Sequence, residues 1–485
     1  MRTLALSSLL MLLLLAPARL EAGSPPTRTQ ILLLECPSAS ALRGRLEAYA
    51  DSCAASDVYG ADEACSALGA SFARAGERDS AIAWYSRADR LLGGSEARLA
   101  LVDLLLERHA TEDVARASTL LRTSLEGIEA PGARVPYQAR LAWALHLMAH
   151  SDSAARLFSE IETPLSASLE WSDRMGRVAL AAGRPGAAMR WLSPVAVASR
   201  GRASEVMEAL SSAIASGAKQ LDLTGLIAAQ VAALDRAEAA RLDALSARPV
   251  SFTTDDGFPL AGAALAPADG VRRVGAIVLV EPGERASSCD SLADILRRAN
   301  FAVLLLERRG HGGSVGPTCA LPFTWRGRED ALDRRCARDV RGALRVLAGM
   351  TRLDTSRCVV VGIGETATTA VRAATLDPRT RALVLVSPAP HPVDRGVVRA
   401  GITALQRPIF FQIAPEDFPL FEQTDTFYQA GVRGRSRVSD ARGAGQGAAQ
   451  FDHDPSVAPR LIRWLAETMS APAPPTPRPT RPRRE

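Results

Sequence analysis

The spacing of apolar residues changes once along this chain, near Ala247. From about Leu46 to Leu245, apolar residues recur at the spacing of amphipathic helices and are separated by short polar breaks. Beyond that point they alternate with polar residues or run together, as they do in half-buried and fully buried strands. A chain of 485 residues is also too long for one hydrophobic core. The pattern therefore predicts a multi-domain protein, with an all-α domain over residues 46–245 and an α/β domain over residues 246–469.

The breaks in the helical part recur at a nearly constant interval. The alanines that open the second helix of each predicted pair lie 34, 39 and 33 residues apart, at Ala81, Ala115, Ala154 and Ala187. This spacing and one well-matched set of residues resemble tetratricopeptide repeats, which have a period of about 34 residues; the set is Leu68, Gly69, Phe72, Ala81, Tyr85 and Ala88. An irregular all-α domain is the alternative. The resemblance implies stacked helix pairs with a face for an unidentified protein or peptide partner.

The α/β part begins with a hairpin and continues with alternating strands and helices. The run from Pro249 to Leu265 alternates around the turn Asp256-Gly257, which predicts the hairpin. Ala276–Val280 and Ala302–Leu306 are typical of buried strands, and the helical pattern over Ser291–Arg298 between them predicts a parallel βαβ unit. Further elements are expected at Asp339–Leu347, Val359–Val361, Ala382–Pro388, Pro408–Ile413 and Arg460–Met469.

The stretch Cys358–Thr369 predicts a strand, a sharp glycine turn and a helix. Together with Glu307–Ser314, which matches an RGxGxS loop, it resembles the α/β-hydrolase family, where the nucleophile lies at the tip of such a turn in a GxSxG motif. Aligning the motif with Gly362–Thr366 places Gly364 at the tip, whereas a register two residues later would place Thr366 there. Neither register contains a serine. The resemblance therefore implies a mostly parallel α/β-hydrolase sheet more strongly than it implies hydrolysis.

Two more positions of the family's catalytic triad can be carried over to this chain. The triad acid follows a late strand, where this chain has Asp417, and the triad histidine precedes the final helix, where this chain has Gln446. A neutral amide cannot accept a proton and return it near neutral pH, so Gln446 cannot be a general base. The resemblance implies that His311, in the RGxGxS loop, is structural. His391 could lie in a short cap, which is a weaker candidate for a base.

The positions of the oxyanion hole are also altered. The backbone amide of Glu365, which follows the tip, keeps the place of the first donor. On the facing loop, the family's His-Gly pair is replaced by Glu281-Pro282-Gly283, which leaves Gly283 as the matching donor position. Pro282 has no N–H group, and Glu281 adds negative charge where an oxyanion would develop.

These residues support two hypotheses about function, and they leave open whether the protein is an enzyme. The first is an exported binding or scaffold protein, a pseudo-hydrolase without a working Ser-His-Asp triad joined to a protein-binding helical module. The alternative is a divergent esterase or peptidase, in which Thr366 replaces the nucleophile and His453, seven residues after Gln446, replaces the base.

The N-terminus resembles a secretory signal peptide over residues 1–22. Arg2 precedes the apolar run Leu4–Leu15, and small residues at Ala16–Ala18 or Leu20–Ala22 mark two cleavage candidates. The run is shorter than the roughly 20 residues that a spanning helix needs, so no membrane span is expected after cleavage, although an uncleaved anchor is the alternative. These features predict an exported protein, whether periplasmic, cell-surface or extracellular. A leader or linker is expected over residues 23–45, and a disordered tail rich in proline and arginine over residues 470–485.

Net charge and cysteine content indicate which partners, disulfides and metal sites can be expected. The formal net charge of +5 is small for this length and spread along the chain, which gives no case for nucleic acid. An exported protein with seven cysteines is expected to form disulfides, and Cys53 with Cys65, or Cys289 with Cys319, are candidate pairs. No CxxC or Cys/His spacing indicates a metal site, and no cofactor is expected.

Overall fold

The computed structural model describes residues 26–53, 56–217, 222–267, 273–350, 353–432 and 434–470. The expected signal peptide lies outside the described residues, as does the expected tail apart from Ser470. Within the described ranges, no helix combines the length and the apolar character that a membrane crossing requires.

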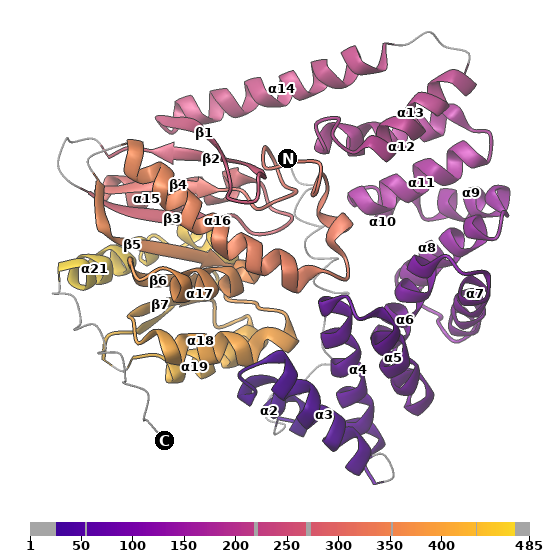
Figure 1. The fold of residues 1–485 in the computed structure, drawn as a ribbon, viewed down its shortest axis with the longest axis horizontal. Coiled ribbons are helices and arrows are strands. Elements are labelled where there is room, and N and C mark those ends of the chain that lie inside the picture. The colour runs from indigo at the N-terminus through magenta and orange to yellow at the C-terminus, as the bar shows by residue number, and fades with distance from the viewer. Residues whose placement is uncertain are drawn as a thin grey trace, which may run out of the picture.

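The N-terminal half is a series of helices that curves around one side of the C-terminal half (Figure 1). The helices are α2 (Arg28–Glu35), α3 (Ala39–Cys53), α4 (Val58–Ala75), α5 (Arg78–Leu91), α6 (Ser95–Arg108), α7 (Thr111–Glu126), α8 (Pro131–Leu147), α9 (Ser151–Glu160), α10 (Glu162–Leu165), α11 (Leu169–Ala181), α12 (Pro185–Ala198), α13 (Ser204–Ser216) and α14 (Leu223–Ala244). All four polar breaks noted in the sequence coincide with boundaries between helices, namely α4/α5, α6/α7, α8/α9 and α11/α12.

Small residues allow the paired helices to approach closely. A Cβ atom added to Gly69 of α4 would lie 2.7 Å from the ring of Tyr85 in α5, and one added to Gly176 of α11 would lie 2.5 Å from Leu192 in α12. In both helix pairs, which are far apart in sequence, a glycine of the first helix therefore makes room for a large side chain of the second. This arrangement is consistent with a helical-repeat region; the assignment to tetratricopeptide repeats stays a prediction.

Residues 28–45, which the sequence analysis assigned to a linker, form α2 and the start of α3. α2 packs against α18 (Arg395–Leu405) of the C-terminal half. The contact is close, because a Cβ atom on Gly396 would lie 2.0 Å from the carbonyl oxygen of Cys36. The first helix of the described chain is therefore anchored on the C-terminal half, far from it in sequence.

The C-terminal half is built on one eight-stranded sheet with the order β1-β2-β4-β3-β5-β6-β7-β8. The strands are β1 (Ala247–Thr253), β2 (Pro259–Leu265), β3 (Arg273–Leu279), β4 (Phe301–Leu306), β5 (Leu353–Ile363), β6 (Thr380–Val386), β7 (Ile409–Ile413) and β8 (Arg437–Asp440). β2 pairs antiparallel with both β1 and β4, and all other neighbours are parallel. This is the hairpin followed by a mostly parallel sheet that the sequence predicted.

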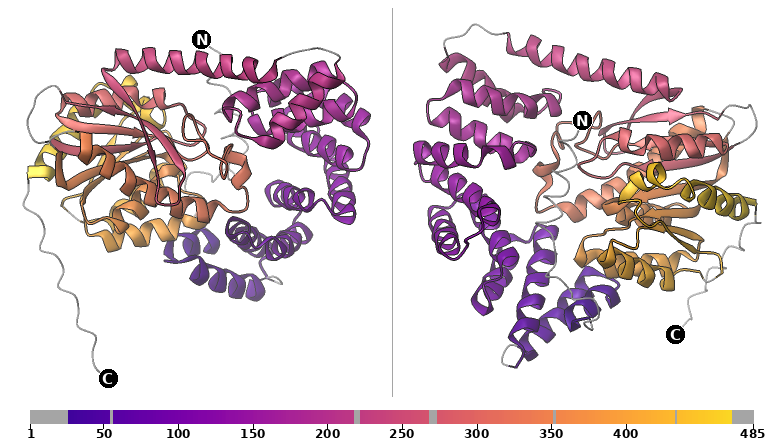
Figure 2. Two further views of the ribbon diagram at one scale, coloured as in Figure 1. Left: turned by 45° about the horizontal axis from the view of Figure 1, so that its top comes forward. Right: turned by 180° about the vertical axis from the view of Figure 1, so that it is seen from behind.

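Helices cover both faces of this sheet, as Figure 2 shows from two sides. One face packs against α16 (Glu329–Met350), α17 (Ala367–Leu376), α18 and α19 (Phe418–Ala430). The other packs against α15 (Asp290–Arg298) and α21 (Val457–Ser470). The remaining short elements are α20 (Gln450–His453), η1 (Ala286–Cys289), η2 (Pro322–Trp325), η3 (Gly364–Thr366), η4 (Pro392–Asp394) and η5 (Gly447–Ala449). The central strands are apolar on both faces because helices bury both.

All seven cysteines are buried thiols, and none forms a disulfide. Cys289 lies in the core on one face of the sheet and Cys319 in the core on the opposite face, so the sheet itself separates this proposed pair. Cys53 ends α3 and Cys65 lies within α4, where both remain unpaired. The expected pairings are therefore not made.

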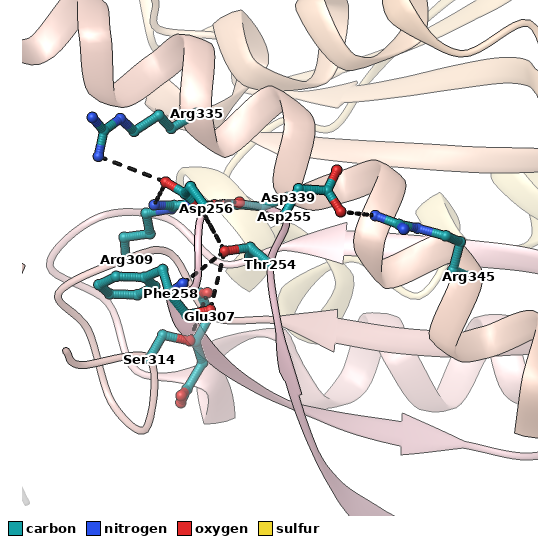
Figure 3. A network of polar contacts seen from close by, with 10 residues as sticks. All are labelled: Thr254, Asp255, Asp256, Phe258, Glu307, Arg309, Ser314, Arg335, Asp339 and Arg345. Carbon is teal, nitrogen blue, oxygen red and sulfur yellow. Dashed lines mark hydrogen bonds and ion pairs between the residues drawn. The ribbon is translucent and has the colours of Figure 1, made fainter.

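The RGxGxS loop is held by a buried arginine (Figure 3). The guanidinium of Arg309 donates two hydrogen bonds to Asp339 of α16, at 2.7 and 2.6 Å, and two to Asp256 of the β1–β2 turn, both at 2.7 Å. Although burial alone lowers it, these two carboxylates raise the pKa of Arg309. The loop that follows β4 is thereby fixed to the hairpin and to a helix on one face of the sheet.

Candidate functional site

The glycine turn after β5 lies where the sequence placed it. Gly364 follows the last residue of the strand and has a φ of +54°, a conformation that glycine adopts without steric cost. Thr366 has a φ of −70° and lies at the start of α17. The left-handed backbone of the tip is therefore at Gly364, which favours the first of the two registers.

The hydroxyl of Thr366 forms hydrogen bonds within the turn itself. Its Oγ1 accepts a hydrogen bond from the backbone N–H of Ile363 at 2.7 Å and lies 2.7 Å from the carbonyl oxygen of the same residue, to which it donates. The side chain is only 3% exposed. Thr366 closes the turn and does not face solvent as a nucleophile would.

Glu281 fills the space next to the tip. A Cβ atom built on Gly364 would lie 1.7 Å from Oε1 of Glu281, which is an overlap and not a contact. Burial, and then the nearby Glu365 and Glu284 carboxylates, raise the pKa of Glu281 to about 7, while a hydrogen bond with the backbone of Glu365 opposes the rise. The Glu281 carboxyl group therefore lies beside the first expected oxyanion donor.

The facing loop forms a tight turn around Gly283. The backbone N–H of Glu284 donates to the carbonyl oxygen of Glu281 at 3.1 Å, and Gly283 has a φ of +84° and is exposed. The turn directs the Glu281 side chain toward Gly364.

The acid and base positions of the triad lie in contact. Nε2 of Gln446 donates a hydrogen bond to Oδ2 of Asp417 at 2.7 Å. Burial raises the pKa of Asp417, and the hydrogen bond from Gln446 partly offsets that effect. Asp417 precedes α19 and Gln446 lies in the loop after β8, so two distant loops meet here. Asp417 is therefore hydrogen-bonded to the residue at the expected histidine position, but that residue, Gln446, is an amide.

None of the six histidines, all within described ranges, takes the place of Gln446. His453 is exposed at the end of α20, where its Nδ1 lies 3.0 Å from the carbonyl oxygen of Ala444. His391 is exposed at the N-cap of η4, where its Nδ1 accepts a hydrogen bond from the backbone N–H of Val393 at 3.4 Å. Burial lowers the pKa of His311 to about 4, and its Nδ1 lies 3.1 Å from the carbonyl oxygen of Arg309. The other three, His109, His146 and His150, belong to the helical half.

A buried polar network beneath the loop that carries Gln446 was not anticipated. Ser387 has a φ of +42°, and its Oγ accepts hydrogen bonds from the N–H of Gly447 at 3.1 Å and from Nε2 of Gln450 at 2.7 Å. Nε2 of Gln412 in turn donates to Oε1 of Gln450 at 2.8 Å. The network fixes the loop, and a serine followed by proline at a strand end is the only signal for it in the sequence.

The described residues contain no cluster of three or more histidine, cysteine, aspartate or glutamate side chains that could hold a metal ion. Glu281 fills the space at the expected nucleophile position, and Gln446 stands at the expected base position next to Asp417.

The sequence matches no family model and no curated protein. Solved structures with a similar fold include the α/β hydrolase GrgF from Penicillium sp. sh18, with 14% identity and a TM-score of 0.38, over 46% of this chain and 99% of that one. The esterase domain from a Rhodothermus marinus protein has 15% identity and a TM-score of 0.35, over 46% of this chain and 98% of that one. The Pyrococcus furiosus esterase Pf2001 has 17% identity and a TM-score of 0.36, over 47% of this chain and 94% of that one.

Proposed function

We propose that this protein acts by binding and not by hydrolysis: its C-terminal half is an α/β-hydrolase-like domain without a working triad, joined to a helical module that binds protein. The observation that carries the proposal is the position of Glu281. Its carboxyl group lies where a side chain at the tip would project, because Oε1 is 1.7 Å from the Cβ position of Gly364.

Triad catalysis needs a nucleophile, a base and a hole for the oxyanion. Gly364 supplies no nucleophile, and Gln446 supplies no base. The Glu281 carboxyl group lies beside the tip and near the backbone of Glu365, whose N–H is the donor that a developing oxyanion would use. A carboxylate at this place would repel the oxyanion. All three requirements are unmet at once.

The alternative, a divergent esterase or peptidase, would depend on Thr366 and His453. The Oγ1 of Thr366 makes two 2.7 Å hydrogen bonds within the turn and is buried. His453 hydrogen-bonds with the loop carbonyl of Ala444, and no hydrogen bond joins it to Asp417 or Thr366 among the described residues. A base must reach the proton that it removes, directly or through one water, so these two residues do not support the alternative.

Export is part of the same proposal and rests on the sequence of residues 1–22 alone. It can be examined by N-terminal sequencing of protein from the native host and by fractionation of its cells. A mature N-terminus after Ala18 or Ala22 would support export to the periplasm, cell surface or medium.

Hydrolysis of short-chain p-nitrophenyl esters tests the proposal directly. The unaltered chain is expected to hydrolyse them no faster than buffer does. A Gly364→Ser change alone should also stay inactive, because the new side chain would meet Glu281. The triple variant Glu281→Gly/Gly364→Ser/Gln446→His removes the obstruction and restores a nucleophile and a base next to Asp417, so it is the variant in which turnover should appear. Turnover by the unaltered chain that is lost in His453→Ala would overturn the proposal in favour of the esterase.

A further inference from the structure

One segment of the C-terminal half covers the inner face of the helical half, the face that its helices turn toward the sheet. This β4–α16 segment, residues 312–333, begins within the RGxGxS loop and ends in the second turn of α16. In Figure 1 it extends from the sheet toward α10 and α11. Its contacts with the helical half run from α4 to the loop between α12 and α13.

The middle of the segment is anchored by apolar side chains. Leu321 is 2% exposed and lies in the same buried cluster as Leu192 of α12 and Val206 of α13. Phe323 packs against that cluster as well. Leu321 is the one buried member of the cluster that comes from outside the helical half, so its side chain occupies a place in the helical core as a ligand side chain occupies a pocket.

An arginine follows at the next turn of the segment. Arg326 forms ion pairs with Glu170 of α11 at 2.6 Å and with Glu107 of α6 at 3.7 Å. Burial opposes the charged form, but the acidic side chains around it, Glu170 first, raise the pKa of Arg326 above its usual value. Arg326, Phe323 and the two glutamates also line a cavity of about 290 Å³ between the halves, together with Trp143 and Arg174. The helices thus present two acids to one cation of the segment.

Both ends of the segment are held by arginines of the helical half. Arg74, in the last turn of α4, pairs with Asp333 at 2.9 Å and Asp330 at 3.5 Å. At the other end, Nε of Arg200 donates to the carbonyl oxygen of Gly312 at 3.2 Å, and Arg202 donates to that of Val315. Backbone carbonyl groups are held here as they are in a bound extended peptide.

We propose that the β4–α16 segment is an intramolecular ligand of the helical half, which closes the inner face to other proteins. An external partner can then bind this face only by displacing the segment. The partner that fits is a peptide with the segment's own pattern around the turn η2: a leucine, an aromatic residue two positions on, and an arginine three positions further. The inference rests on the proposed function, in which the helical half is a binding module.

Competition between the tethered segment and a free peptide tests this inference. The probe is a fluorescein-labelled peptide of residues 312–330, and its anisotropy is measured with the full chain. A tethered ligand acts at an effective concentration in the millimolar range, so the unaltered chain should bind the probe weakly. The variant Leu321→Ala/Arg326→Ala loosens the tethered segment and should bind the same probe at least about tenfold more tightly. Hydrogen exchange of residues 312–333 should rise in that variant.

Arg328→Ala is the matched control. Arg328 is exposed two residues from Arg326, and its hydrogen bond goes to the carbonyl oxygen of Thr324 within the segment, so its loss should not open the face. A probe that carries the Leu321→Ala and Arg326→Ala changes should not bind any form of the chain. If circular dichroism shows that the double variant is unfolded, Arg326→Ala alone replaces it, since this side chain is partly exposed.

Two results would overturn the inference: equal binding of the probe by the unaltered chain and the variant, or no binding by a variant whose segment has lost its protection from exchange. A segment that stays protected in the variant would also overturn it, because the named contacts would then not hold it. Ester hydrolysis by the unaltered chain would contradict the proposed function without changing the result of this test, so the two failures are distinguishable.

Discussion

Two loops at the same edge of the sheet differ in how they are held: one by a buried arginine between two carboxylates, the other by a turn without a side chain at its tip. The RGxGxS loop after β4 places Arg309 between Asp256 and Asp339, and every hydrogen bond in that contact is between 2.6 and 2.7 Å. The glycine turn after β5 has no side chain at its tip, and Glu281 fills the space beside it. Arg309 therefore fixes one loop by paired charges, whereas the turn at Gly364 is filled by a carboxyl group that lies next to two other acidic residues. The turn forms without a side chain at its tip.

The largest effect should come from removing the arginine that holds the RGxGxS loop. We expect Arg309→Met to lower the free energy of unfolding by about 3–5 kcal/mol, because it leaves the buried Asp339 carboxylate without its partner. Arg345→Met is the control: its ion pair with Asp255 joins side chains that are 59% and 80% exposed, and such pairs contribute about 0–1 kcal/mol. Chemical denaturation followed by circular dichroism measures both. Similar losses in the two variants would mean that the buried network is no more important than a surface pair.

Periodicity and turn chemistry were sufficient to predict the sheet and the position of the tip. The buried run Val359–Val361 forms the centre of β5, the turn at Gly257 closes the hairpin, and Gly364 has the positive φ that the turn requires. These features are local, so a short stretch of sequence contains the whole signal.

What the sequence did not predict depends on contacts between distant residues. It identified Glu281 as a negative charge near the oxyanion position, but only the structure shows its carboxyl group in the space next to Gly364. It offered Thr366 as a substitute nucleophile, whereas the structure shows that the Thr366 hydroxyl forms hydrogen bonds within the turn. Arg326 and Glu170 are 156 residues apart, and no periodic pattern links such a pair. The helices over residues 28–45 were missed because the chain there is short and is stabilised by packing on α18.

A second prediction concerns the turn at Gly364, where Glu281 fills the space beside the tip. Gly364→Ala should destabilise the protein in two ways: an alanine at positive φ costs about 1–2 kcal/mol, and overlap with Glu281 adds about 1–3 kcal/mol. Gly443→Ala isolates the first effect, because Gly443 has a φ of +68° and nothing lies within 4 Å of its added Cβ atom.

A double-mutant cycle isolates the second effect. If Glu281 fills the space at the tip, Gly364→Ala should cost no more than Gly443→Ala does once Glu281→Ala is also present. A cost that is the same with and without Glu281 would show that the carboxyl group is not in the way, and the comparison between the two loops would lose its main observation.

The smallest predicted effect is the dependence of stability on pH. Burial and the neighbouring acids raise the pKa of Glu281 to about 7 in the folded protein, from 4.5. The folded state then binds more protons than the unfolded state between these two values, so this group's contribution to stability is fully present below about pH 4.5 and is lost as the pH rises toward 7. Because one pKa unit corresponds to about 1.36 kcal/mol, the loss should reach up to about 3 kcal/mol. In Glu281→Gln the amide carries no charge, so denaturation curves between pH 4.5 and pH 8 should lack this component, while Glu284→Gln on the same exposed turn should keep most of it, because burial is the largest cause of the shift. Equal pH profiles for the unaltered chain and Glu281→Gln would mean that the pKa of Glu281 is not raised on folding, which would contradict the burial of its carboxyl group beside Gly364.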